Sequence, residues 1–145
     1  MTDENLAAGI AAVLRGYATA PLSACNVYED DQLGYESLGN VTVVITGGSE
    51  VPEAIGEQFA DEISLVIVGR VLWGDTVATK LSIRNLCKQI RYCLRGTNRR
   101  LQVVSEYATR NSNISCEYGY ESNVDRTFRT CQVRVTYRVP QDAVT

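Results

Sequence analysis

The 145-residue sequence contains no histidine. This absence removes the commonest general base, the commonest metal ligand and the usual partner of a catalytic serine or cysteine. Glycine-rich phosphate loops are missing as well, because Gly34 and the pair Gly47-Gly48 fit neither the GxGxxG nor the Walker pattern. We therefore expect a protein that is not an enzyme and that has no catalytic residues, no metal site and no cofactor.

Long apolar runs are also missing, since no stretch approaches the roughly 20 residues that a helix needs to cross a bilayer. We expect no membrane association. The start of the chain, Met1-Thr2-Asp3-Glu4, is acidic where a secretory signal would be basic, so we expect the protein to stay inside the cell that makes it. The five cysteines are scattered and include no CxxC pair, which indicates reduced, mostly buried thiols rather than a zinc site or a disulfide framework.

Charge is distributed unevenly along the chain. Residues 1–79 contain 12 acidic and two basic residues, whereas residues 80–145 contain 12 basic and five acidic residues. The two parts therefore carry formal charges of −10 and +7, within a net charge of −3. This polarity suits nucleic-acid binding by the basic part, and it equally suits contact between the acidic part of one copy and the basic part of the next.

Two segments have the periodicity of amphipathic helices. The first begins at Thr2 and is closed by Pro21. The second is capped by Asp75 or Thr76 and ends near Gly96. Its apolar side faces the core, and five basic residues occupy an arc about 80° wide beside that side. These residues, which we call the basic ridge, are Lys80, Arg84, Lys88, Arg91 and Arg95.

Stretches that are rich in valine and isoleucine, or that alternate between apolar and polar residues, predict β-strands. The order of helices and strands predicts a single α+β domain over residues 1–145, with a mostly antiparallel sheet and both a short N-terminal helix and one long helix packed on one face. A turn at Asn123-Val124 would bring Cys116 nearly opposite Cys131, the pair for which we consider a disulfide. The predicted strands are Cys25–Tyr28, Val41–Thr46, Ser64–Trp73, Leu101–Tyr107, Ile114–Tyr120 and Phe128–Val139.

The segment between the second and third predicted strands is strongly acidic. We interpret residues 47–63 as a long excursion of a hairpin, with room for one helical turn after Pro52. Because the basic ridge and this segment have opposite charges, we predict that they meet between neighbouring subunits of a closed ring. A solvated helix face and a phosphate-binding surface are the alternatives for the ridge. The residues of the segment, which we call the acidic excursion, are Glu50, Glu53, Glu57, Asp61 and Glu62.

Two further sets of residues have a simple structural interpretation. The acidic cluster at residues 29–31 could hold a cation or perform acid–base chemistry, but its spacing matches no calcium loop and favours a solvated turn. We assign Tyr118, Tyr120 and Tyr137 to packing within the sheet rather than to a binding cage.

The order of these features resembles that of the tail terminator, or tail-completion, proteins of tailed bacteriophages. The resemblance covers nearly the whole chain and rests on pattern and order rather than on an invariant motif. Glu50–Glu62 corresponds to a long excursion in that family, and Thr76–Arg95 to its packed helix. The other segments that carry the resemblance are the N-terminal helix, the runs Val41–Ile45 and Leu65–Val68, the helix end Ile90–Gly96 and the strand Val133–Arg138.

The resemblance implies a virion protein at the junction of tail and neck. Its subunits would form a homo-hexameric ring at the head-proximal end of the tail tube, stop tube polymerisation and join the tail to the neck. The implied partners are copies of the chain itself, the tail tube protein and a neck or head-completion protein. Genomic DNA would be only a passing cargo, and assembly would take place in the host cytoplasm. Another neck or head-completion protein and a small nucleic-acid-binding module are the alternative functions.

Overall fold

The structure is a computed structural model that describes residues 3–29, 39–52, 59–73, 77–95, 100–103, 106–110, 113–122 and 127–140. The helices of this part of the chain are α1 (Asp3–Arg15) and α2 (Val77–Cys93), with a short 3-10 turn, η1, at Leu22–Ala24. Neither α-helix is long and apolar enough to span a bilayer. The strands are β1 (Asn26–Tyr28), β2 (Asn40–Pro52), β3 (Phe59–Leu72), β4 (Arg100–Val103), β5 (Glu106–Arg110), β6 (Ser115–Ser122) and β7 (Thr127–Pro140).

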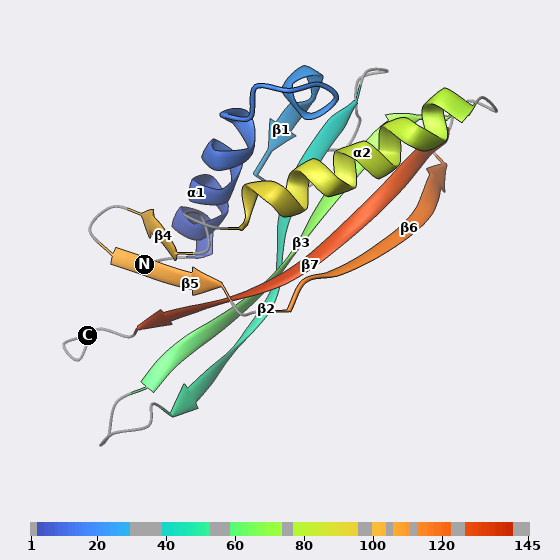
Figure 1. The fold of residues 1–145 in the computed structure, drawn as a ribbon. Coiled ribbons are helices and arrows are strands. Elements are labelled where there is room, and N and C mark those ends of the chain that lie inside the picture. Colours follow the sequence, from blue (N-terminus) through green and yellow to red (C-terminus); the bar gives the residue numbers. More distant parts are fainter. Residues whose placement is uncertain are drawn as a thin grey trace.

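The seven strands form one long, twisted sheet (Figure 1). Along the sheet the order is β1-β2-β3-β7-β5-β4, and β6 is a second neighbour of β7. The pair β1–β2 is parallel, and the other described pairs are antiparallel. Strands β5 and β6 share one edge of β7, because β5 pairs with Tyr137 and Arg138 while β6 pairs with the residues from Thr127 to Arg134.

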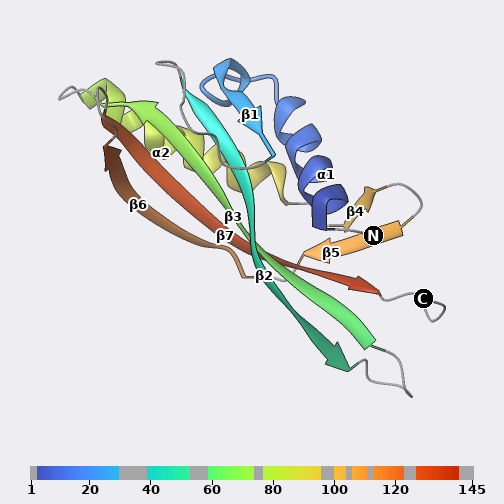
Figure 2. The same cartoon turned by 180° about the vertical axis from the view of Figure 1, so that it is seen from behind.

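Both α-helices cover the same face of the sheet, and the opposite face carries no helix (Figures 1 and 2). The core lies between this face and the helices, and burial follows the alternation expected of a strand with one covered face. In β7 the apolar residues from Cys131 to Val139 are buried, and in α2 the buried residues include Leu86, Cys87 and Ile90. The predicted fold class is therefore confirmed.

Close contact between α2 and the sheet depends on Gly69 in β3. A Cβ atom at this position would lie 2.8 Å from Cδ2 of Leu86 and 2.9 Å from Sγ of Cys131. Those separations are shorter than van der Waals contact, so a residue with a side chain would push the helix and the sheet apart. The lack of a side chain at Gly69 thus determines how closely α2 packs against the sheet.

Two predicted boundaries are wrong. The segment Leu101–Tyr107 contains two short strands, β4 and β5, which pair with each other instead of forming one strand. Residues 47–63 are not a long excursion, because β2 continues to Pro52 and β3 begins at Phe59 in continuous cross-strand register. Apolar alternation could not reveal these strand ends, since the side chains from Thr46 to Glu50 are exposed. The helical turn predicted after Pro52 falls in residues 53–58, outside the described part of the chain.

Candidate functional site

The basic ridge lies on the solvent side of α2. Lys80, Arg84 and Lys88 are exposed, and Arg95 is exposed with its guanidinium carbon 5.0 Å from the centre of the Tyr92 ring. The remaining member, Arg91, is half-buried, and its Nε atom is buried without a hydrogen-bond partner. No salt bridge involves the ridge among the residues that the structure describes. The helix therefore presents a row of positive charge that the described chain does not neutralise.

The acidic excursion is the end of the β2–β3 hairpin, and β7 runs beside β3 there as far as Ala60. Glu50 in β2 lies opposite Asp61 in β3, and Glu62 lies opposite Ser49. Glu53 and Glu57 fall outside the described residues. Residues 49–52 and 59–62, which we call the acidic arm, project beyond both helices at one end of the sheet (Figures 1 and 2).

A bulge in β2 decides which side of the sheet the charge of the arm faces. The register shifts between Ile45 and Gly47, so one extra residue enters β2 at this point. Beyond the bulge Gly48 pairs with Ile63 and Glu50 pairs with Asp61. Directly opposite residues of an antiparallel pair point to the same face. Ile63 belongs to the core, and Asp61, two residues away on β3, faces the same side. Glu50, which lies opposite Asp61, therefore points to the side of the sheet that carries the helices.

The ridge and the arm of one chain do not meet. In both views α2 extends from one end of the sheet to about its middle, whereas the tip of the arm lies at the other end (Figures 1 and 2). The described structure therefore offers two oppositely charged surfaces that are separated within a single copy. Each is accessible to a second molecule.

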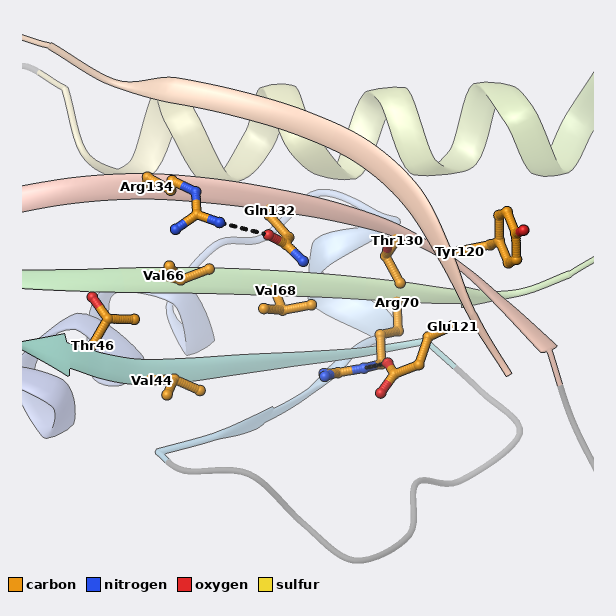
Figure 3. Close-up of a pocket in the computed structure, with 10 residues that line it drawn as sticks. All are labelled: Val44, Thr46, Val66, Val68, Arg70, Tyr120, Glu121, Thr130, Gln132 and Arg134. Carbon is orange, nitrogen blue, oxygen red and sulfur yellow. Dashed lines mark hydrogen bonds and ion pairs between the residues drawn. The ribbon is translucent and has the colours of Figure 1, made fainter. Parts of the chain in front are cut away.

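The face of the sheet without helices contains an open groove of about 670 Å³ (Figure 3). Val44, Val66 and Val68 give it an apolar floor, and Arg134 donates a hydrogen bond to Oε1 of Gln132 at 3.2 Å. Among the lining residues the sole carboxylate belongs to Glu121, which is held by an arginine. The groove thus offers no free carboxylate for acid–base chemistry.

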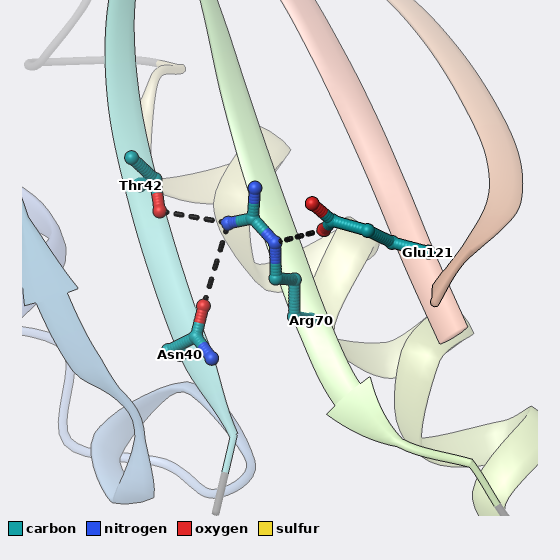
Figure 4. A network of polar contacts seen from close by, with 4 residues as sticks. All are labelled: Asn40, Thr42, Arg70 and Glu121. Carbon is teal, nitrogen blue, oxygen red and sulfur yellow. Dashed lines mark hydrogen bonds and ion pairs between the residues drawn. The ribbon is translucent and has the colours of Figure 1, made fainter. Parts of the chain in front are cut away.

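That arginine, Arg70, is the centre of a polar network that the sequence did not reveal (Figure 4). Its side chain is 5% exposed and forms a salt bridge through Nε with Oε2 of Glu121. Its Nη1 atom donates to Oγ1 of Thr42 at 2.8 Å and to Oδ1 of Asn40 at 3.4 Å. The network links β2, β3 and β6 across the sheet. No local pattern marks Arg70, because its partners lie far away in the sequence.

The acidic cluster at residues 29–31 has a structural explanation where it is described. Glu29 forms a salt bridge of 3.4 Å with Arg15 at the end of α1, and both side chains are about half exposed. Residues 30 and 31 lie outside the described chain. Among the described residues no group of three acidic or cysteine side chains could hold a metal ion.

An aromatic cluster lies at the end of β6. The rings of Trp73 and Tyr120 meet edge to face with their centroids 6.0 Å apart, and the Arg129 guanidinium lies 3.8 Å from the centre of the Trp73 ring. Tyr118 and Tyr120 are 52% and 73% exposed, so their assignment to packing within the sheet is wrong. Both project from β6, which has a neighbouring strand on one side only among the strands that the structure describes. Tyr137 in central β7 is buried, as predicted.

The cysteines depart from expectation at one pair. A disulfide joins Cys87 in α2 to Cys116 in β6, so the prediction that all thiols are reduced is wrong for these two residues. Cys116 lies opposite Val133 in the sheet, which excludes the alternative pairing with Cys131. The other three cysteines are free, and burial raises their pKa values, to about 11 for Cys25 and Cys93 and to about 12 for Cys131.

No known protein family and no curated protein matches this sequence. The surfaces described above are therefore the basis for a functional assignment.

Proposed function

We propose that this chain is a structural subunit that joins copies of itself head to tail in a closed ring. The basic ridge of one copy contacts the acidic arm of the next. On the resemblance to tail terminators, the ring has six members and sits at the head-proximal end of a phage tail tube. There it ends tube polymerisation and presents the surface that receives the neck.

The observation that carries this proposal is the separation of two exposed, opposite charges in one chain. The acidic arm, which carries Glu50, lies at one end of the sheet, and α2, which carries Arg84, lies over the other part (Figure 1). A contact between the two surfaces therefore requires a second copy. A contact between two different surfaces of the same chain is heterologous, and it closes into a ring when the rotation between copies permits. Opposite charges also steer such a contact and fix its register.

Mass photometry combined with negative-stain imaging tests the proposal. We expect closed rings at about 0.1 M salt and their loss at about 1 M, because the Debye length falls from roughly 10 Å to 3 Å over this range. Added tail tubes should be capped at one end. A chain that stays monomeric at low salt and ignores tube ends would contradict the proposal.

Charge reversal identifies the contact. Arg84→Glu combined with Lys88→Glu should abolish rings and leave the monomer folded, because both side chains are exposed. The matched control, Arg84→Lys combined with Lys88→Arg, keeps the charge and should form rings. Adding Glu50→Lys to the reversed ridge should restore part of the assembly. Arg91 is left unchanged because it is partly buried, so its replacement would also disturb packing.

The exposed ridge also supports a second function, binding to the phosphate backbone of a nucleic acid. Such binding would be salt-dependent and largely independent of sequence. A monomer that shifts DNA in a gel, with the shift lost in the reversed-ridge variant and kept in the matched control, would favour this function over a ring.

A further inference from the structure

Strand β6 has an open edge. It pairs with β7 over its eight residues, and no described strand occupies its other side. Every residue of β6 except Cys116 is exposed. Soluble proteins commonly protect a long edge strand with proline, lysine or a bulge. The sequence of β6 contains neither proline nor lysine, and its register with β7 is unbroken. Its two charged residues, Glu117 and Glu121, lie opposite Gln132 and Phe128 and so point to the face without helices. This edge is therefore suited to pairing with another strand.

A second open edge lies on the opposite side of the same sheet. Strand β1 covers β2 only at Asn40–Thr42, and no described strand pairs with that side of β2 from Val43 to Pro52. The strands between the two open edges follow the order β2-β3-β7-β6, and each neighbouring pair is antiparallel. Because directions alternate over four strands, a copy that continues the sheet brings its β2 antiparallel to β6 of the first copy. The same contact can then repeat around a ring.

On the side of the sheet that carries the helices, the charges near the two edges agree with this arrangement. Glu50 on β2 points to the side of the sheet that carries the helices, as shown by its register with Asp61. The basic ridge lies on that side too, and the disulfide between Cys87 and Cys116 fixes α2 beside β6. A β2 strand added to β6 would therefore place the carboxylate of Glu50 on the same side as the ridge of the neighbouring copy.

The side chains at the end of β6 have the composition of an interface centre. Tyrosine, tryptophan and arginine are enriched among the residues that contribute most to protein–protein binding. Trp73, Tyr120 and Arg129 form such a group, and the Tyr120 ring is 73% exposed in the single copy. Tyr118 lies two residues away on the same face of β6.

We propose that the open edge of β6 docks the open edge of β2 from a second copy, so that one antiparallel sheet continues across the subunit boundary. Main-chain hydrogen bonds provide the contact, and the attraction between the arm and the ridge selects the partner and the register. This inference rests on the proposed ring, and it specifies which strands meet in that ring.

Hydrogen exchange with mass spectrometry tests the proposal on the full chain. The ring of the wild-type protein is compared with the reversed-ridge variant (Arg84→Glu, Lys88→Glu), which serves as the monomer in the same buffer. We expect amides of β6 and of β2 beyond Val43 to exchange about tenfold more slowly in the ring, which corresponds to about 1.4 kcal/mol of added protection. The central strands β3 and β7, already paired on both sides, should change little.

The outcomes separate the two proposals. A ring in which the amides of β6 exchange as fast as in the monomer would overturn the strand pairing but not the ring. The open edge of β6 would then be available to a strand of another protein. Absence of any ring in the wild-type protein would overturn both. As a second measurement, Tyr118→Glu should weaken assembly at least tenfold because it sets a carboxylate on the side of the sheet to which the incoming Glu50 points, whereas Tyr118→Phe should assemble normally. Equal assembly of these two variants would contradict the pairing.

Discussion

The salt bridge between Arg70 and Glu121 permits a quantitative test of what stabilises the sheet. We consider Glu121→Gln, which removes the charge and keeps the shape of the side chain. Arg70 would then remain buried, with its guanidinium bonded to the neutral groups of Thr42 and Asn40. Breaking a fully buried ion pair costs about 3–5 kcal/mol. Because the Glu121 side chain is 47% exposed, solvent screens part of the interaction, and we expect a loss of about 1–2 kcal/mol in the free energy of unfolding.

A double-mutant cycle isolates the pair from the other contacts of Arg70. Urea and thermal denaturation are measured for the wild type, Glu121→Gln, Arg70→Met and the double variant, at a protein concentration that keeps the chain monomeric. Glu121→Gln should lower the melting temperature by about 2–8 °C, since about 1 kcal/mol corresponds to 2–4 °C in a domain of this size. In the Arg70→Met background the same change should cost little, which gives a coupling energy of about 1–2 kcal/mol. Additive effects of the two substitutions would refute the assignment of the network as a unit.

Two further predictions concern packing and the thiols. Gly69→Ala should destabilise the fold by about 1–3 kcal/mol in urea denaturation, because its Cβ atom would meet Leu86 and Cys131 too closely. Gly47→Ala, whose Cβ atom would meet nothing within 4 Å, is the control, and equal effects would refute this account. Alkylation by iodoacetamide at pH 8 should be about a hundredfold slower at Cys93 in the folded protein than in urea, because its pKa rises from 9.0 to about 11 and the thiolate is the reactive form. Peptide mapping measures both rates, and similar labelling in the two states would contradict the burial of this thiol.

The parts of the fold that could be predicted are the helices and strands whose hydrophobic period can be recognised within one segment of the sequence. The alternation from Cys131 to Val139 identified β7 as a strand with one covered face, and the helical spacing of Ile83, Leu86 and Ile90 identified the buried side of α2. The basic ridge followed from the same local geometry, since residues on one helix have fixed positions relative to each other. Periodicity therefore predicted both the fold class and the position of one charged surface.

The remaining features depend on which distant segments become neighbours. The salt bridge between Arg70 and Glu121 joins residues 51 positions apart. The contact between Trp73 and Tyr120 joins the residue that follows β3 to β6, and α2 lies between them in the sequence. The acidic arm escaped prediction for another reason. Its strand ends project beyond the helices, so neither helix covers them and no apolar alternation results. Neither open edge of the sheet could be recognised before the order of the strands was known.

The bulge in β2 gives the arm a tolerance to changes in length. A strict alternation continued from Val41 would put Glu50 on the face without helices, and the extra residue between Ile45 and Gly47 reverses that assignment. A chain shorter by one residue at this point could pair without a bulge and keep Glu50 opposite Asp61. In β7, which has unbroken register, deletion of one residue would turn Arg134 toward the core. A single-residue gap in related sequences would therefore be silent at the bulge and disruptive in the central strand.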